Sequence, residues 1–386
     1  MLGKKIKLLF VTKTFYQAGA ERFLYELDAV IDRTVFDVSV MVVESLNKSK
    51  RWKDYYFEKH KALGDTIYFY DELSAKIHPT IKERLQFHVM KKPLPDEDRR
   101  LKLFLDSYDV ISFIGENNFI GLKKYITQSI WNKSVIHILN SIHQNKNLYV
   151  NYDKQKQYLF CSGFLDDDLK TELDGFKNYE HHYITLAIKI EQKERVFKYR
   201  QNRKKKIGIF TRLTTHKPLD PFFYALQLLT DRVENIELHI YGSGNPEEEG
   251  MMNYVKRLGL EAKVFFRGHQ EDMKQTAVKD EIDLVWFHGY YGQPGGFASF
   301  DVTSVGIPQI FWDFSNMANP KFSEVYPMYN HLSTFVEKSF EILNDAEQAS
   351  KLSDLQYETL LKTYNVELYA PKMEQIWKTI AQRNNS

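Results

Sequence analysis

The sequence predicts an α/β protein made of two doubly wound domains, and three observations favour that class. Short apolar runs of strand length alternate with segments of helical periodicity, an order that implies parallel sheets covered by helices. The 386 residues are 43% hydrophobic and 27% charged, which is enough chain for two ordinary domains that each have a core. A dense basic run near the middle interrupts the alternation, and the apolar pattern restarts directly after it.

Composition and charge exclude several classes of protein. The net charge of +2 gives no reason to expect nucleic acid as a partner. Cys161 is the only cysteine, which excludes an internal disulfide and fits a reducing compartment. The first residues lack the apolar core of a signal peptide, and no apolar run approaches the roughly 18–20 residues that span a bilayer. We therefore expect a cytoplasmic protein, with peripheral contact at the inner face of a membrane left open.

The first half opens with a strand, a loop, a helix and a second strand. Residues 7–11 form an apolar run, 20–27 have helical spacing and 36–43 form the next strand, so a parallel βαβ unit is predicted. Further strands are expected at residues 66–70, 110–113, 134–138 and 158–161. Gly19 lies in the first loop, either as part of a ligand site or as an ordinary turn glycine. The turn glycine is what these residues favour by themselves.

The segment 77–100 is rich in charge and is interrupted by Pro93 and Pro95. Two interpretations remain: a solvated helix face followed by a loop, which is the more common outcome, and a surface that contacts anionic lipid. The lipid interpretation depends on a mixture of basic and apolar residues, namely Ile81, Lys82, Leu85, Phe87, Val89, Lys91 and Lys92.

Two histidines mark the strand at residues 134–138: His137 lies within it and His143 lies beyond its end. Ligands bind outside strand ends on one side of an open sheet, and a histidine with a pKa near 6.5 can orient or deprotonate an acceptor hydroxyl. A structural histidine is the alternative. The acidic run 166–168 precedes a helical pattern, and we interpret it as a helix cap and not as a metal site.

Residues 193–206 form a basic linker between the two domains. Its charges are Lys193, Arg195, Lys198, Arg200, Arg203, Lys204, Lys205 and Lys206. A run of this kind is usually a solvated linker, and contact with membrane phospholipid or with a charged acceptor carrier is the alternative.

The second half places polar residues after consecutive strands. Arg212 and Lys217 follow the strand at 207–210, and two fixed cations would offset the charge on a departing nucleoside diphosphate. Gly242 follows the strand that ends at Tyr241, and Arg267 closes a third strand.

Residues 293–310 lie between two apolar runs and contain a Gly-rich turn followed by a short helix. A turn that feeds a helix presents backbone N–H groups and a positive dipole end, which suits a phosphate. Gln293 and Asp301 bracket the turn, so one face could hold a sugar while the backbone near Gly296 and Phe297 holds its phosphate.

In order and spacing these motifs resemble those of retaining GT-B glycosyltransferases of family 4, the glycosyl transferases group 1. The two glutamates of the family's Glu-x7-Glu motif fall on Gln293 and Asp301, while Gly296, Gly306 and Pro308 are in register with its other fixed positions. The first loop at 19–22 and the Tyr-Gly-x-Gly turn at 241–244 also match the family, as do Arg212 and Lys217 as its diphosphate clamp.

The resemblance implies the GT-B fold, in which two Rossmann-like doubly wound domains face each other across a cleft. Residues 1–192 would form the acceptor-side domain, 193–206 the linker and 207–365 the nucleotide-sugar domain. Residues 366–386 would form a helix that returns to the first domain, with an apolar stripe suited to docking there.

The resemblance also implies the activity. It implies a metal-independent hexosyl- or N-acetylhexosaminyl-transferase with no cofactor besides its donor, which is expected to be a UDP-sugar. The acceptor would be a glycan or a lipid-linked or protein-linked sugar, in surface polysaccharide or glycoconjugate biosynthesis. Catalysis would be carried by Arg212, Lys217, Gln293 and His143, and the donor would be bound by Gly19, Gly242, Arg267, Gly296, Phe297 and Asp301.

Two other classes of function stay open. Gln293 keeps a hydrogen bond but lacks the negative charge of a glutamate, so a catalytically weakened protein that binds another glycosyltransferase is one alternative. A non-transferring enzyme of the same fold, such as a nucleotide-sugar epimerase, is the other. It would need several carboxylates and histidines around the sugar, and residues 293–301 lack them.

Overall fold

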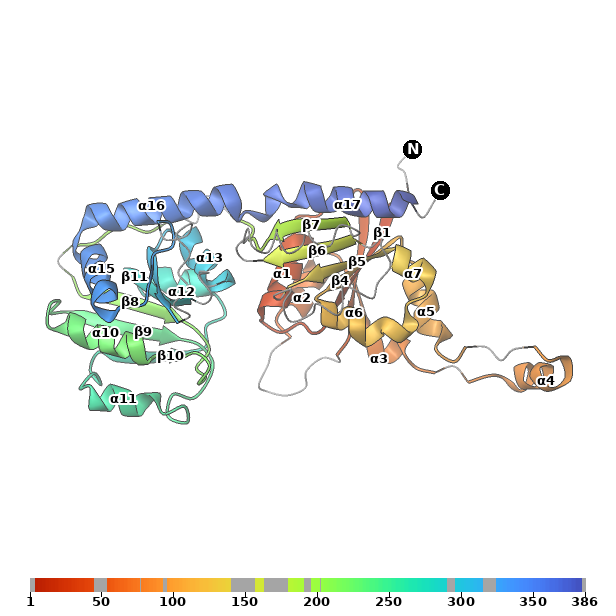
Figure 1. Cartoon of the computed structure of the whole chain (residues 1–386), viewed down its shortest axis with the longest axis horizontal. Helices are drawn as coiled ribbons and strands as arrows, with labels where there is room; N and C mark the ends of the chain where they lie inside the picture. Colours follow the sequence, from red (N-terminus) through yellow and green to blue (C-terminus); the bar gives the residue numbers. More distant parts are fainter. Residues whose placement is uncertain are drawn as a thin grey trace. The chain divides into compact units, whose positions relative to one another are not determined.

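The computed structural model describes residues 4–44, 54–76, 78–92, 96–139, 157–162, 180–190, 196–201, 203–289, 296–314 and 324–383. The chain divides into two compact units. The first consists of Met1–Lys189 together with Val366–Ser386, and the second of Ile190–Asn365. Each unit is built around one parallel sheet with helices packed on it (Figure 1).

The sheet of the first unit has seven strands in the order β3-β2-β1-β4-β5-β6-β7. The strands are β1 (Ile6–Thr12), β2 (Phe36–Val42), β3 (Thr66–Phe69), β4 (Val110–Ile114), β5 (Ser134–Ile138), β6 (Gln157–Ser162) and β7 (Glu180–Thr185). All neighbouring strands run parallel, and the order reverses between β1 and β4. The central strands are apolar on both faces, as expected for a parallel sheet that is covered on both sides.

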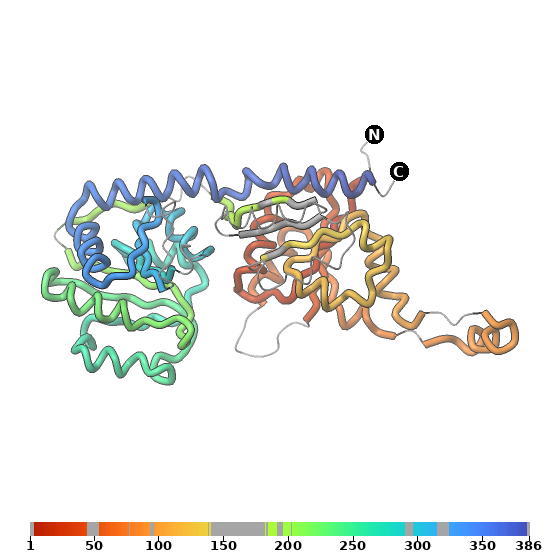
Figure 2. The backbone as a smooth tube through the Cα atoms, viewed as in Figure 1, coloured from red at the N-terminus to blue at the C-terminus, as the bar shows by residue number. Residues whose placement is uncertain are grey.

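Short helices connect these strands. They are α1 (Gly19–Asp28), α2 (Phe57–Ala62), α3 (Tyr70–Leu73), α4 (Ile81–Met90), α5 (Arg99–Asp106), α6 (Glu116–Leu122) and α7 (Gln128–Asn132), with a 3₁₀ turn at Lys123–Tyr125. The trace in Figure 2 follows the chain through this unit from β1 to β7.

The last helix, α17 (Ala370–Arg383), packs on the first unit, after a 3₁₀ turn at Val366–Leu368. Its Trp377 is fully buried and meets the rings of Phe10 in β1 and Phe36 in β2 edge-on, with centroid separations of 5.6 and 5.7 Å. The prediction that the final helix returns to the first domain is therefore confirmed.

The sheet of the second unit has six strands in the order β10-β9-β8-β11-β12-β13. The strands are β8 (Lys205–Phe210), β9 (Ile236–Tyr241), β10 (Val264–Gly268), β11 (Leu284–Gly289), β12 (Gln309–Asp313) and β13 (Met328–Tyr329). Its helices are α10 (Asp220–Thr230), α11 (Met251–Arg257), α12 (Met273–Lys279), α13 (Phe297–Ser304), α15 (Leu332–Asn344) and α16 (Ala346–Thr363). This strand order is that of a doubly wound, Rossmann-like domain.

Trp286 of β11 lies at the centre of the second core. Its ring stacks on Phe222 of α10 at 5.9 Å and lies 5.2 Å from the ring of Phe335 of α15. The indole N–H donates to Ser339 Oγ over 3.1 Å, so this buried polar group is satisfied.

The predicted α/β class with two doubly wound units is confirmed. The sequence analysis did not predict strands β7 and β13 or helices α3, α5, α6, α7 and α12. The acidic run 166–168 lies outside the described residues. Within the described ranges, no helix is both long and apolar enough to cross a bilayer.

Candidate functional site

The sheet of the second unit places its switch point between β8 and β11. These two strands are neighbours and run parallel, with Leu284 opposite Ile207 and Val285 opposite Gly208. Ligands of open α/β sheets bind outside the carboxyl ends of the strands where the order reverses. The segment that carries Arg212 and Lys217 follows β8, and the helix that begins at Phe297 follows β11. The topology therefore brings the two predicted phosphate-binding segments to the same edge of one sheet.

Arg212 is held by hydrogen bonds on both sides of it. Thr211 N donates to Tyr241 O over 2.9 Å, and Leu213 N donates to Ser243 O over 2.8 Å. The side chain of Arg212 is exposed. A fixed backbone with an exposed guanidinium is the arrangement that an anion-binding arginine needs.

Gly242 has a structural role that the sequence analysis did not predict. A Cβ atom at this position would lie 1.6 Å from Thr211 O, so only glycine permits the turn after β9 to approach the segment that carries Arg212. The N–H of Gly242 donates to Gly268 O over 2.9 Å and is used within the sheet. Gly242 thus positions Arg212, and its predicted direct contact with the donor stays a prediction.

Lys217 is half-buried in the same loop, where its backbone N donates to Thr214 O over 2.9 Å. Burial and the positive charge of Arg212 together lower the pKa of the Lys217 ammonium below its ordinary value. Two neighbouring cations repel each other, and a bound anion would relieve that repulsion. The pair is therefore suited to a diphosphate.

His288, the penultimate residue of β11, holds the loop that carries Lys217 through a hydrogen bond to the backbone. Its Nε2 lies 3.0 Å from Pro218 O and can only donate to that carbonyl. Burial and the charge of Lys217 lower the pKa of His288 to about 4, so the ring is neutral at pH 7. It stacks on Phe314 at 5.2 Å and meets Phe222 edge-on at 5.1 Å. No motif in the sequence analysis pointed to this residue; its place at a strand end was the available signal.

The first turn of α13 forms the other side of this edge. Gly296 is its N-cap, is exposed, and has open space where a Cβ would lie. Ser299 N donates to Gly296 O, which begins the helical ladder. The amides at Phe297 and the turn after it belong to a helix start, where backbone donors and the dipole favour an anion.

Of the two residues that align with the family's glutamates, Gln293 and Asp301, the structure describes only Asp301. Gln293 lies outside the described residues. Asp301, in the second turn of α13, is only 4% exposed. Burial to this degree favours contacts within the protein for its carboxylate, and the predicted contact with a ribose stays a prediction.

Arg267 lies at the end of β10, and its side chain is exposed. Its Nε donates to His239 Nδ1 over 3.2 Å, and its guanidinium lies 5.0 Å from the centroid of the Phe265 ring. The backbone carbonyl of Arg267 accepts a hydrogen bond from Gln270 Nε2 over 3.0 Å. Base recognition by this residue is untested.

In the first unit, Gly19 begins α1 at the carboxyl end of β1, the corresponding edge of that sheet. It is exposed, with open space where a Cβ would lie. Two residues further, Glu21 is buried and accepts a hydrogen bond from the hydroxyl of Thr14. Burial raises the pKa of Glu21. His143, the predicted acceptor-side histidine, lies outside the described residues.

His137, the other candidate histidine, is a core residue. It is fully buried in β5, its Nε2 lies 2.6 Å from Ser112 Oγ, and its ring meets Phe23 edge-on at 5.6 Å. Burial lowers its pKa to about 3. A histidine without access to solvent cannot take a proton from an acceptor hydroxyl, so the structural alternative holds for this residue.

Among the described residues, Asp28, His60 and Asp65 are the group whose side chains could hold a metal ion. His60 Nδ1 lies 2.8 Å from Asp28 Oδ2 and 3.0 Å from Asp65 Oδ2. The guanidinium of Arg33 also reaches both carboxylates, at 2.7 and 2.9 Å. The imidazole of His60 and the guanidinium of Arg33 already contact both carboxyl groups, so we interpret the group as a buried polar network that joins α1, α2 and the start of β3.

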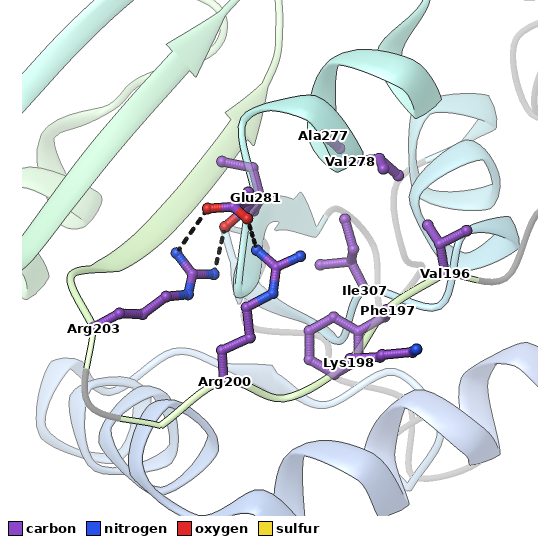
Figure 3. A pocket seen from close by; sticks show the side chains of 10 residues that line it. Val196, Phe197, Lys198, Arg200, Arg203, Ala277, Val278, Glu281 and Ile307 are labelled. Carbon is purple, nitrogen blue, oxygen red and sulfur yellow. Dashed lines mark hydrogen bonds and ion pairs between the residues drawn. The ribbon is translucent and has the colours of Figure 1, made fainter.

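Several cations in the described part of the basic linker have partners within the second unit. Arg203 pairs with Asp283 at 2.7 Å, and Lys204 with Glu237 at 2.8 Å. Lys205 Nζ donates to Arg200 O over 2.7 Å. A pocket lies against this segment, and Figure 3 shows Arg200 and Arg203 both turned toward Glu281, with Lys198 pointing away from it. The pocket lies near the starts of β8 and β11, at the opposite edge from Arg212.

Comparisons with known proteins bear on the family of the second unit and on the fold. Residues 191–319 match the family described as Glycosyl transferases group 1, and no curated protein matches the chain. HepE from Anabaena, in complex with UDP and glucose, is 13% identical with a TM-score of 0.65, and the match covers 97% of this chain and 99% of that one.

Two further solved structures are similar. A TarM mutant from S. aureus, in complex with Fondaparinux, alpha-GlcNAc-glycerol and UDP, is 11% identical with a TM-score of 0.66, covering 96% and 99% of the two chains. Sucrose-phosphate synthase from Thermosynechococcus elongatus is 12% identical with a TM-score of 0.63, covering 97% and 99%. The chain therefore has the GT-B fold, and its residues 191–319 form a domain of the glycosyl transferases group 1 family.

Proposed function

We propose that this protein is a retaining glycosyltransferase that moves a sugar from a UDP-sugar to a glycan or glycoconjugate acceptor. The observation that carries the proposal is the pair of cations, Arg212 and Lys217, at the switch point of a glycosyl transferases group 1 domain. The uridine nucleotide is supported by HepE and TarM, whose structures contain UDP, and HepE has also been crystallised with UDP-glucose.

The charges suit the chemistry of a departing diphosphate. As the bond from the anomeric carbon to the phosphate oxygen breaks, negative charge grows on the diphosphate and positive charge on the sugar ring. Arg212 and Lys217 would offset the charge on the leaving group, together with the amides at the start of α13. Backbone hydrogen bonds hold the segment that carries both cations before the ligand arrives, which limits the reorganisation needed during the reaction.

The acceptor hydroxyl would approach the anomeric carbon on the face from which the diphosphate leaves, which gives retention. It would give its proton to the departing phosphate oxygen. In this proposal the protein contributes position and charge, and no side chain is needed as a nucleophile. The acceptor would be held by the first unit, whose sheet has its own switch point between β1 and β4.

The test is a panel of nucleotide sugars with the full chain. We expect UDP and UDP-sugars to stabilise the protein against heat, and a UDP-sugar to be hydrolysed slowly without acceptor, with the α-anomer released from an α-linked donor. Arg212→Ala should strongly reduce both effects. Arg257→Ala is the matched control, because Arg257 is an exposed arginine at the end of α11, just before the amino end of β10.

The outcomes separate the candidate functions. Stabilisation by UDP-sugars without turnover, even with acceptors present, would favour a catalytically weakened binding protein. In that case Gln293→Glu should restore turnover if the missing charge is the cause. Neither stabilisation nor turnover with any nucleotide sugar would contradict both proposals.

A further inference from the structure

Among the described helices of the first unit, α4 contributes no buried side chain to the core. The chain leaves α3, forms α4 and returns to α5 (Figure 1), and none of the side chains of α4 is buried. Ile81, Leu85 and Val89 are 88%, 62% and 72% exposed. Because they recur every fourth residue, they share one face of the helix and form an apolar stripe, while Phe87 and Met90, 39% and 59% exposed, lie on the opposite side.

The helix is nevertheless well defined at both ends. Thr80 and Glu83 form a capping box: Glu83 N donates to Thr80 Oγ1, and Thr80 N donates to a carboxylate oxygen of Glu83 over 2.7 Å. Lys91 ends the helix in a left-handed conformation, with φ of 54°. An isolated helix of this length is marginal in water, so a specified start and stop with an uncovered apolar stripe indicate a helix that acts on a partner.

The charges around the stripe identify the partner. Residues 81–92 carry four cations against one carboxylate, namely Lys82, Arg84, Lys91 and Lys92 against Glu83. All four cations are exposed, whereas Glu83 is engaged in the cap and lies 3.7 Å from Arg99. An exposed apolar stripe bordered by lysine and arginine is the surface that lies in the interface of an anionic membrane.

A second copy of this chain fits the same surface less well. A two-fold dimer would bring each α4 against its own copy, so that four cations face four cations. A helix of ten residues is about 15 Å long, and a stable protein interface buries about 800 Å² on each partner. The basic linker is also a weaker candidate for lipid contact, because Arg203, Lys204 and Lys205 are engaged within the second unit.

We propose that α4 is a membrane-docking helix, which lays the stripe of Ile81, Leu85 and Val89 into the headgroup region of a bilayer that contains anionic phospholipid. The cations beside the stripe meet the lipid phosphates, and the helix lies on the surface without spanning it. This inference stands on the first unit alone and does not depend on the proposed transferase activity.

The experiment is flotation of the full chain with vesicles of phosphatidylcholine, with and without phosphatidylglycerol. We expect binding only with phosphatidylglycerol, and binding that weakens as salt is added. The variant with Lys82→Glu, Lys91→Glu and Lys92→Glu should lose roughly fivefold or more in partitioning for each cation removed. The variant with Ile81→Ser, Leu85→Ser and Val89→Ser should lose binding even at low salt, because the apolar contribution is gone.

Matched controls use the same substitutions elsewhere on the surface. Lys256→Glu with Arg257→Glu changes exposed cations on α11, and Leu228→Ser with Leu368→Ser changes half-exposed apolar residues outside α4. Both controls should bind vesicles as the wild type does, and unchanged circular dichroism and thermal unfolding would show that the α4 variants are folded.

Three results would overturn the proposal. They are equal binding to neutral vesicles, wild-type binding by the α4 variants, and no binding accompanied by a dimer in solution that the serine variant dissociates. The last result would assign the stripe to a second copy of the chain.

Discussion

His288 in β11 donates a hydrogen bond through Nε2 to the carbonyl oxygen of Pro218, over 3.0 Å. This bond joins the end of one central strand to the loop that follows its neighbour, β8. Pro218 is the residue after Lys217, so the contact holds the backbone that carries this half-buried lysine. The low pKa of His288, about 4, keeps a single proton on the ring at neutral pH, so the role of each nitrogen is fixed.

The first prediction concerns His288. His288→Phe keeps the packing against Phe222 and Phe314 but leaves Pro218 O without its donor. We expect the free energy of unfolding of the second unit to fall by about 1–3 kcal/mol and UDP to bind roughly tenfold more weakly. Chemical unfolding and calorimetric titration with UDP measure the two effects.

His288→Gln is the matched variant, because its amide can still donate to Pro218 O. It should recover part of the UDP affinity that His288→Phe loses. UDP affinity at the wild-type level in His288→Phe would show that the loop does not need this bond.

The second prediction is a loss of stability in acid that originates at His137. Burial lowers the pKa of His137 to about 3 in the folded chain, whereas an unfolded histidine titrates near 6.5. Below pH 6.5 His137 is therefore protonated in the unfolded chain but stays neutral in the folded chain. The free energy of unfolding should fall as pH falls, by up to about 1.4 kcal/mol per pH unit until the folded pKa is reached. His288 acts in the same direction in the second unit.

Urea unfolding of the first unit at pH 7 and pH 5 measures this effect. His137→Gln should be less stable at pH 7, because the contact with Ser112 is disturbed, but its stability should change less between the two pH values. His78→Gln, at an exposed histidine, is the control and should keep the wild-type pH dependence. The same slope in His137→Gln as in the wild type would assign the acid sensitivity to other groups.

The third prediction concerns the approach of two backbones at Gly242. In Gly242→Ala the new methyl group would lie 1.6 Å from Thr211 O, so the loop that carries Arg212 must move. We expect a loss of stability on the order of 3–5 kcal/mol in the second unit, with loss of UDP binding in any folded protein that remains. Gly19→Ala is the steric control, because open space surrounds its added methyl group and it begins a helix. Similar stability losses in both variants would contradict the steric argument.

The fold was predictable where the local pattern is strong. β8 and β11 are apolar runs that are buried on both faces, and both were visible as such in the sequence. β7 was missed because its sequence, Glu-His-His-Tyr-Ile-Thr, is half polar, and β13 because it has two residues. Both segments are strands because they pair with a neighbouring strand of the sheet, and local sequence does not reveal that pairing.

The site shows the same division. Arg212 and Lys217 were predicted because their type and spacing match the family's motif; the structure places both in the loop after β8, and their role as a diphosphate clamp stays a prediction. The sequence did not show which groups a side chain would contact. Cations of the linker pair with Asp283 and Glu237, which are distant in sequence. Gly242 was predicted to bind the donor. The structure shows that its lack of a side chain is required by the close approach of Thr211 O, and sequence alone does not show which backbones approach each other.

The last prediction concerns Arg212 and Lys217 as one diphosphate clamp. Hydrogen bonds to charged groups contribute about 1.5–3 kcal/mol, so Arg212→Ala and Lys217→Ala should each weaken UDP binding by roughly 10–100-fold. Uridine, which has no phosphate, should bind almost equally to the wild type and both variants, and the loss of UMP affinity should lie between those of uridine and UDP.

The same clamp predicts a pH dependence of UDP binding. Burial and the charge of Arg212 hold the pKa of Lys217 below its ordinary value, so UDP affinity should fall as the pH rises through that lowered pKa. In Arg212→Ala one cause of the lowering is gone, so this alkaline loss should move to higher pH. Titration calorimetry with UDP, UMP and uridine across alkaline pH measures all of these effects, with Arg257→Ala as the control. An equal loss of uridine and UDP binding in either variant would show damage to the domain and not the removal of a phosphate contact.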